Sequence, residues 1–112
     1  MIFVTGPLCS GKKEYVRTAL GLSLEEFVQK AVWDVQDLAA DAPDLEELAE
    51  QLSAYEIVVA SEVGGGVVPV EPAERAAREA AGRLACLLAR RADTVVRVIC
   101  GLPQILKGEL PC

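Results

Sequence analysis

A net charge of −6 on 112 residues excludes a general nucleic-acid-binding surface, which relies on clustered basic residues. Hydrophobic residues make up 52% of the chain and charged residues 25%, a balance typical of a globular protein. We expect a single domain over residues 1–112, and no apolar run approaches the ~18 residues that a membrane-spanning helix needs. The chain starts without a basic segment, so we expect no signal peptide and a cytoplasmic location.

The cysteine and histidine content limits the chemistry further. The 4 cysteines are widely spaced, none forms a CxxC pair, and the sequence has no histidine. We therefore expect no zinc site and predict free thiols in a reducing compartment. Mechanisms that use an imidazole base or a phosphorylated or nucleotidylated histidine are excluded.

The first twenty residues contain the strongest motif. An apolar run over 2–5 predicts a strand, Gly6 and Gly11-Lys12 follow, and a helix is expected over 13–20, which is the order of a GxxxxGK phosphate-binding loop. Glycines let the loop point N–H groups inward, and the helix N-terminus adds a partial positive charge. The predicted phosphate-binding residues are Gly6, Pro7, Leu8, Cys9, Ser10, Gly11, Lys12 and Lys13. A glycine-rich turn with two solvated lysines is the alternative.

Lys13 departs from the usual loop pattern. The position after the loop lysine normally carries Ser or Thr, whose hydroxyl ligates Mg²⁺, and a protonated lysine cannot do so. We therefore predict nucleotide binding that is nearly independent of Mg²⁺, and the pattern supports nucleotide binding better than catalysis.

The segment after Gly21 is predicted to be helical. Ser23 and Glu26 form a capping-box pattern, and apolar residues at helical spacing predict a helix over 24–40. A second helix is expected over 44–53, capped by Asp44, with the acidic residues of both on a solvated face. Trp33 is expected to pack in the core or in an interface.

The apolar run over 55–60 predicts a strand buried on both faces, as in a parallel sheet. This strand brings Ser61 and Glu62 to its carboxyl end, where open α/β sheets bind ligands. The glycines over 64–66 indicate either a loop that approaches a ligand or a plain linker.

Pro72 is expected to begin the longest helix, over 72–91. Its arginines are predicted to be mostly solvated, with one or two near an anion. A third strand over 94–100 and a turn over 101–103 complete the pattern. The order β–α–α–α–β–α–β predicts an α/β class: a small three-layer fold of the P-loop NTPase type, with a mainly parallel sheet of about three strands and the strand over 2–5 near its middle.

Three further segments carry a family resemblance. They are EVGGGVVP over 62–69, REAAGRL over 78–84, and ADTV over 92–95 running into GLP over 101–103 and Lys107. They resemble the motifs EVGxGIVP, FRDxxGRxNQ and ADxVxxVxxGxPxxxK of the adenosylcobinamide kinase/adenosylcobinamide-phosphate guanylyltransferases of cobalamin biosynthesis.

The resemblance implies GTP or ATP as nucleotide and a corrinoid substrate whose aminopropanol hydroxyl accepts the γ-phosphoryl group. It implies that the strands over 56–60 and 94–100 flank the loop strand. Lys12 and Glu62 are the implied catalytic residues, with Glu62 near the γ-phosphate, orienting Mg²⁺-bound water or the acceptor hydroxyl. It also implies a homo-oligomer.

The departures from the family motifs restrict the function. The family histidine that accepts GMP is absent, which excludes guanylyl transfer by that route. Ser61 stands where the family has Asn, and Ala85-Cys86 where it has Asn-Gln. A family aspartate has no clear counterpart, with Asp34 and Asp37 as substitutes. A catalytically inactive nucleotide-binding sensor or partner subunit is the alternative function, and an unrelated structural role is a third.

Overall fold

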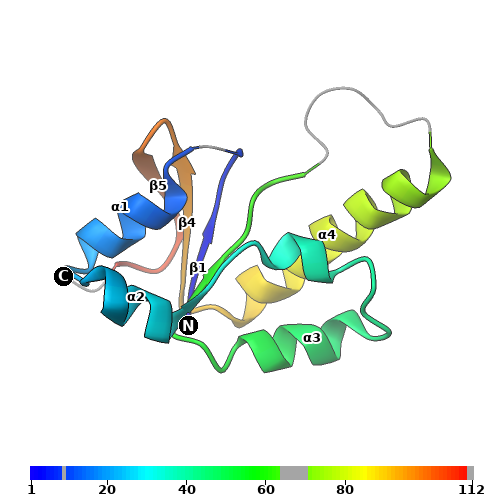
Figure 1. Cartoon of the computed structure of the whole chain (residues 1–112), viewed down its shortest axis with the longest axis horizontal. Coiled ribbons are helices and arrows are strands. Elements are labelled where there is room, and N and C mark those ends of the chain that lie inside the picture. The colour runs from blue at the N-terminus through cyan, green and yellow to red at the C-terminus, as the bar shows by residue number, and fades with distance from the viewer. Residues whose placement is uncertain (9, 64–70, 111–112) are drawn as a thin grey trace.

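The computed structural model describes residues 1–8, 10–63 and 71–110 and contains a five-stranded sheet in the order β2-β3-β1-β4-β5 (Figure 1). The parallel strands are β1 (Ile2–Thr5), β2 (Ala31–Val32), β3 (Ile57–Val59) and β4 (Thr94–Ile99). The last strand, β5 (Leu102–Lys107), runs antiparallel to β4. As predicted, β3 and β4 flank β1, which precedes the glycine-rich segment.

The predicted helix over 24–40 is wrong, because this segment forms three elements. Helix α2 (Leu24–Lys30) is followed by strand β2 and by the 3₁₀ helix η1 (Val35–Leu38). Ala31 adopts an extended backbone and pairs with the first residue of β3, and Asp34 has a left-handed backbone with φ 57°. The apolar residues do not form one stripe: Phe27 and Ala31 pack on one face of the sheet and Val35 on the other.

The predicted number of about three strands is also wrong, because β2 and β5 bring the sheet to five strands. The segment over 102–107, read from the sequence as a turn and a tail, is a six-residue strand. The connection from β4 consists of Cys100 and Gly101, both with positive φ (53° and 73°), as a tight two-residue hairpin requires. Pro103 is compatible with β5 because this strand forms the sheet edge.

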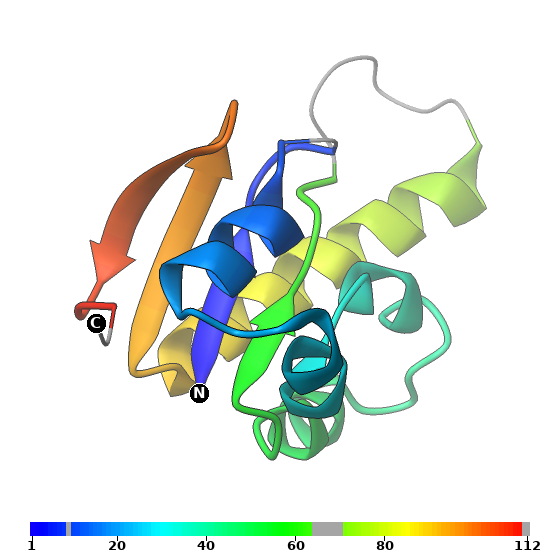
Figure 2. The same ribbon diagram turned by 60° about the vertical axis from the view of Figure 1, so that its left-hand side comes forward.

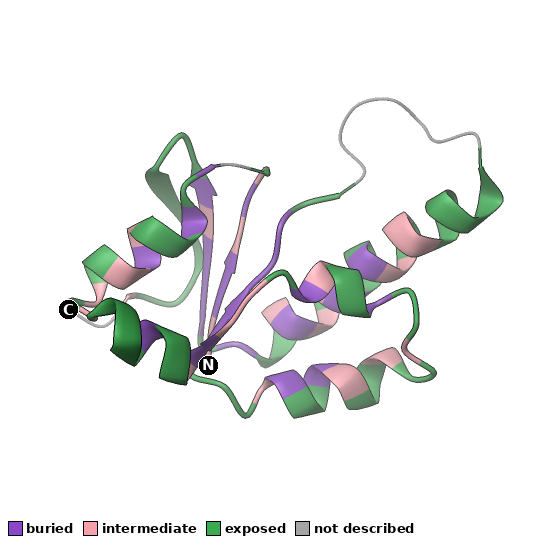
Figure 3. Cartoon of the chain, in the orientation of Figure 1, coloured by how far each residue is buried: buried purple, intermediate pink, exposed green. Residues whose placement is uncertain are grey.

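Helices cover both faces of the sheet and give the predicted three layers (Figure 2). Helices α1 (Lys12–Ala19) and α2 pack on one face, whereas η1, α3 (Leu45–Leu52) and α4 (Pro72–Arg91) pack on the other. Successive strand residues therefore enter different cores. In Figure 3 the buried positions of the helices form stripes, with exposed residues between them.

Local signals set several helix starts. Ser23 Oγ accepts a hydrogen bond from the N–H of Glu26 (3.1 Å) and the Glu26 carboxylate accepts one from the N–H of Ser23 (3.0 Å), which confirms the capping box. Asp44 caps α3, and Pro72 begins α4. In the described part of the chain, no helix combines the length and apolar character needed to cross a bilayer.

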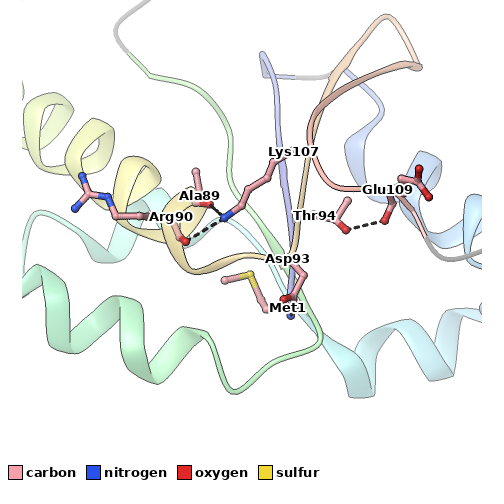
Figure 4. Close-up of polar contacts among 7 residues, drawn as sticks. All are labelled: Met1, Ala89, Arg90, Asp93, Thr94, Lys107 and Glu109. Carbon is pink, nitrogen blue, oxygen red and sulfur yellow. Dashed lines mark hydrogen bonds and ion pairs between the residues drawn. The ribbon is translucent and has the colours of Figure 1, made fainter.

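The amino ends of β1 and β4 are tied together by polar contacts (Figure 4). The Met1 amino group donates to the Asp93 carboxylate (2.8 Å), and Thr94 Oγ1 donates to the Glu109 carbonyl (2.7 Å). Lys107 Nζ donates to two carbonyls in the last turn of α4, at 3.1 and 3.2 Å. A cation at this end of a helix interacts favourably with the negative end of the helix dipole. Asp93 and Lys107 of the family-like motif therefore hold the end of the sheet opposite the glycine-rich segment.

Candidate functional site

Residues 6–8 and 10–12, here called the glycine loop, lie between β1 and the first turn of α1, and Gly6 packs against the backbone of β4. Gly6 has φ 151°, and a Cβ on it would lie 2.2 Å from the Val98 carbonyl oxygen, so this position requires glycine. Gly11 has φ 82°, and the neighbouring Ser10 carbonyl accepts a hydrogen bond from the Gly101 N–H (2.8 Å). The loop is thereby anchored to the β4–β5 hairpin. Cys9 lies outside the described residues.

Lys12 is the first residue of α1, and its side chain is buried against the glycine loop. Its Nζ donates to the Pro7 carbonyl at 2.7 Å and lies 3.5 Å from Ser10 Oγ. Gly11 provides no side-chain cap for α1, in contrast to the capped starts of α2 and α3. A buried ammonium and an uncapped helix N-terminus therefore meet at the loop, an arrangement that attracts anions.

Lys13 lies on the outside of α1 and is exposed. Its Nζ stands 5.4 Å from the centroid of the Trp33 ring, a cation–π distance. Trp33 in turn stacks on Phe27, with ring centroids 5.7 Å apart and 14° between the planes. Trp33 packs against the core on the α1–α2 face of the sheet, as predicted, and the ammonium of Lys13 lies near its ring, just after β2.

Glu62 follows β3 and is joined to the glycine loop through its backbone, because its N–H donates to the Gly6 carbonyl (2.8 Å). Its carboxylate accepts two hydrogen bonds from Arg97, from Nε at 2.6 Å and from Nη2 at 2.8 Å. These bonds lower the pKa of Glu62, and the positive charge of Lys12 contributes in the same direction. Glu62 is therefore ionised at neutral pH and suited to orienting a hydroxyl rather than to strong base chemistry.

A cavity of about 1030 Å³ opens beside the loop, at the upper end of the ~300–1,000 Å³ typical of small-molecule sites. The predicted residues Pro7, Leu8 and Glu62 line it together. Side chains from β4, η1 and α4 complete the wall, among them Arg97, Gln36, Asp37, Glu74 and Arg78.

Two residues of this site were not predicted from the sequence. Arg97 interrupts an otherwise apolar strand, TVVRVI, which was the available signal. Gln36 was assigned to a long helix, but its Oε1 accepts a hydrogen bond from the Ser61 N–H (3.0 Å) beside Glu62. Of the two aspartates considered as family counterparts, Asp37 lines the cavity, whereas Asp34 occupies the left-handed turn before η1. The glycines over 64–66 lie outside the described residues.

Two features beside the loop bear on metal binding. Position 13 has no hydroxyl, and the Glu62 carboxylate is engaged by Arg97. Among the described residues, no group of three His, Cys, Asp or Glu side chains lies close enough to hold a metal ion by itself. Of the cysteines in the described ranges, Cys86 and Cys100 are free thiols.

A glycine loop between the first strand and first helix of a mostly parallel sheet, with charged residues at the carboxyl edge, defines a small α/β domain of the P-loop-like class. The chain belongs to the cobinamide kinase / cobinamide phosphate guanyltransferase family, whose model matches residues 18–106. This confirms the family predicted from the sequence, although the matched span begins after the glycine loop.

The chain is also similar to a curated protein of Pseudomonas aeruginosa, the bifunctional adenosylcobalamin biosynthesis protein CobP. The two are 37% identical over 76 residues, which is 68% of this chain and 44% of the relative. The chain therefore spans less than half the length of this relative.

Proposed function

We propose that the chain binds a nucleoside triphosphate, GTP or ATP, at the glycine loop and transfers the γ-phosphoryl group to a hydroxyl of a cobinamide-type corrinoid in cobalamin biosynthesis. The observation that carries the proposal is the buried ammonium of Lys12, 2.7 Å from the Pro7 carbonyl at the uncapped start of α1. Family membership supports the corrinoid as acceptor.

In this proposal, loop N–H groups and Lys12 hold the phosphate oxygens with charge-assisted hydrogen bonds. The acceptor hydroxyl enters the cavity and is oriented by Glu62. Its oxygen bonds to the γ-phosphorus as the bond to the bridging oxygen breaks, the nucleoside diphosphate leaves, and the hydroxyl proton passes to Glu62 or to solvent. Positioning and charge supply most of such catalysis, so the lowered pKa of Glu62 is compatible with its role.

We do not extend the proposal to guanylyl transfer. The 112 residues contain no histidine, so they cannot form a histidine-linked GMP intermediate. The cytoplasmic location expected from the sequence stays a prediction.

The second candidate function is nucleotide binding without catalysis, as a sensor or partner subunit. Two observations favour it: Lys13 replaces the hydroxyl that would ligate Mg²⁺, and Arg97 neutralises the Glu62 carboxylate. Both affect transition-state stabilisation more than ground-state binding.

We also propose a homo-oligomer, with a second copy paired along the outer edge of β5. All six residues of β5 are exposed, and Leu102, Ile105 and Leu106 place apolar side chains there. An open apolar edge of this length favours pairing with another strand, and a second β5 would pair about a two-fold axis.

The test of the proposed function is calorimetric titration of wild-type protein and Lys12→Ala with GTP and ATP. We expect Lys12→Ala to weaken binding at least about tenfold, about 1.4 kcal/mol. Lys30→Ala, a lysine on α2 outside the loop, is the matched control and should bind as wild type does. Equal affinity of wild type and Lys12→Ala would overturn the proposal. Tight binding without phosphoryl transfer from GTP or ATP to cobinamide would select the binding-only alternative.

A further inference from the structure

Arg97 occupies a fixed position beside the glycine loop. It pairs in register with Thr5, the last residue of β1 before the loop, and neighbouring strands lie about 4.8 Å apart. The next residue of β4, Val98, provides the carbonyl against which Gly6 packs. The backbone that carries the guanidinium is therefore fixed relative to the loop.

The partner of Arg97 is itself attached to the loop. The two hydrogen bonds from Arg97 to Glu62, at 2.6 and 2.8 Å, link β4 to a residue whose N–H is bonded to Gly6. Both side chains are 34% exposed and both line the cavity with Pro7 and Leu8. Because the pair is about one-third exposed, solvent screens part of its attraction despite the bidentate geometry. A phosphate group offers a guanidinium the same bidentate geometry with more negative charge, so it can compete with Glu62 for Arg97.

We propose that Arg97 is the residue that recognises the terminal phosphate of the nucleotide. In the free protein it pairs with Glu62, and in the complex it turns to the γ-phosphate, which releases Glu62 toward the acceptor. The proposal rests on nucleotide binding at the glycine loop and adds to it a selectivity for triphosphate over diphosphate. A diphosphate keeps its contacts to the loop and Lys12 and leaves the Arg97–Glu62 pair intact.

The test compares ATP with ADP, and GTP with GDP, by calorimetry in EDTA, so that a metal ion does not contribute. Wild type should prefer the triphosphate, and Arg97→Met should lose this preference by roughly tenfold to a hundredfold while its diphosphate affinity stays the same. Glu62→Gln removes the competing partner and should tighten triphosphate binding, roughly twofold to fivefold. Arg91→Met, at the far end of α4, removes the same charge outside the cavity and should change neither ratio.

The opposite signs of the two effects separate recognition from mere stability, since both substitutions break the same ion pair. Weaker triphosphate binding in Glu62→Gln, or an unchanged triphosphate preference in Arg97→Met, would overturn the role of Arg97. Those results leave the loop proposal intact where Lys12→Ala still loses binding. Wild-type protein that binds neither nucleotide would overturn both. Thermal melting of each variant checks folding, and Arg97→Lys, which retains the charge but not the bidentate geometry, should show an intermediate preference.

Discussion

Replacing Lys13 by serine should make nucleotide binding depend on Mg²⁺. An ammonium ~4 Å from a divalent ion would repel it by about 4 kcal/mol per unit charge at an effective dielectric of 20, and by about 1 kcal/mol in bulk water. The structure places the Lys13 ammonium 5.4 Å from the Trp33 ring centroid and exposed, where a cation–π contact contributes about 0.5–1 kcal/mol. Repulsion at this solvated position is therefore small, and the main deficit is the missing hydroxyl ligand.

Lys13→Met separates these two effects, because it removes the charge without supplying a hydroxyl. We expect Mg²⁺ to change the affinity of wild type and of Lys13→Met by less than about threefold, and to tighten binding by Lys13→Ser at least about tenfold. Calorimetric titration with GTP or ATP, in EDTA and in saturating Mg²⁺, measures these affinities.

Two results would refute this reasoning. Lys13→Met with the same Mg²⁺ dependence as Lys13→Ser would show that repulsion, rather than the missing ligand, controls the metal. Wild-type protein that binds nucleotide only with Mg²⁺, or that turns over at ordinary kinase rates of ~1–100 s⁻¹, would show that Lys13 does not impair the site.

Three further predictions concern stability and assembly. Gly6→Ala should lower the free energy of unfolding by about 1–3 kcal/mol, because the new Cβ would lie 2.2 Å from a carbonyl oxygen. Gly82→Ala, which has open space around it in α4, should raise it by about 0.5–1 kcal/mol. The melting temperatures of the two variants should therefore shift in opposite directions, and shifts of the same sign would contradict this prediction. Because Arg97 lowers the pKa of Glu62 in the folded state, the ion pair stabilises the fold above the unfolded pKa of about 4.3, and this stability is lost as the pH falls through the lowered pKa. Urea unfolding should therefore show that Arg97→Met loses less free energy of unfolding on acidification than wild type does. An equal loss in both proteins argues against the ion pair. Light scattering at micromolar concentration should give wild type a mass above the 11.9 kDa of one chain, and Ile105→Lys on β5 should return the mass to that of the monomer. A mass of 11.9 kDa for wild type contradicts the proposed oligomer.

Elements set by local chemistry were predictable from the sequence. Helix α4 begins at Pro72 and ends at Arg91 as expected, because proline favours a helix start and apolar residues at helical spacing form its buried stripe. The prediction of one helix over 24–40 was wrong because of a contact with a distant part of the chain. Apolar residues at helical spacing lie on one face only if the helix continues, and the pairing of Ala31 with Ile57 in the sheet interrupts it. The left-handed backbone of Asp34 then redirects the chain.

The same distinction applies to the site. Lys12 and Glu62 were predicted together because the loop motif and the parallel strand both point to the carboxyl edge of the sheet. The role of Arg97 could not be predicted from a local sequence pattern. Its side chain reaches Glu62 because the register of β4 on β1 puts both on the α4 face of the sheet, and no local signal in TVVRVI specifies that register.

Lys13 and Arg97 bear on the same electrostatic problem from different elements. A bound triphosphate requires positive charge near its terminal oxygens, and the usual loop supplies part of it through a hydroxyl-bound Mg²⁺. Here position 13 has no hydroxyl, and the adjacent strand β4 carries the guanidinium of Arg97 opposite the last residue of β1. A guanidinium needs no protein ligand and stays charged at every physiological pH, but it brings one positive charge where Mg²⁺ brings two. In the proposed function, the guanidinium therefore supports binding of the triphosphate more than it supports the transition state. On this reasoning Lys13→Ser, which adds a metal ligand, should raise triphosphate affinity in Mg²⁺, and Arg97→Met, which removes the guanidinium, should lower it.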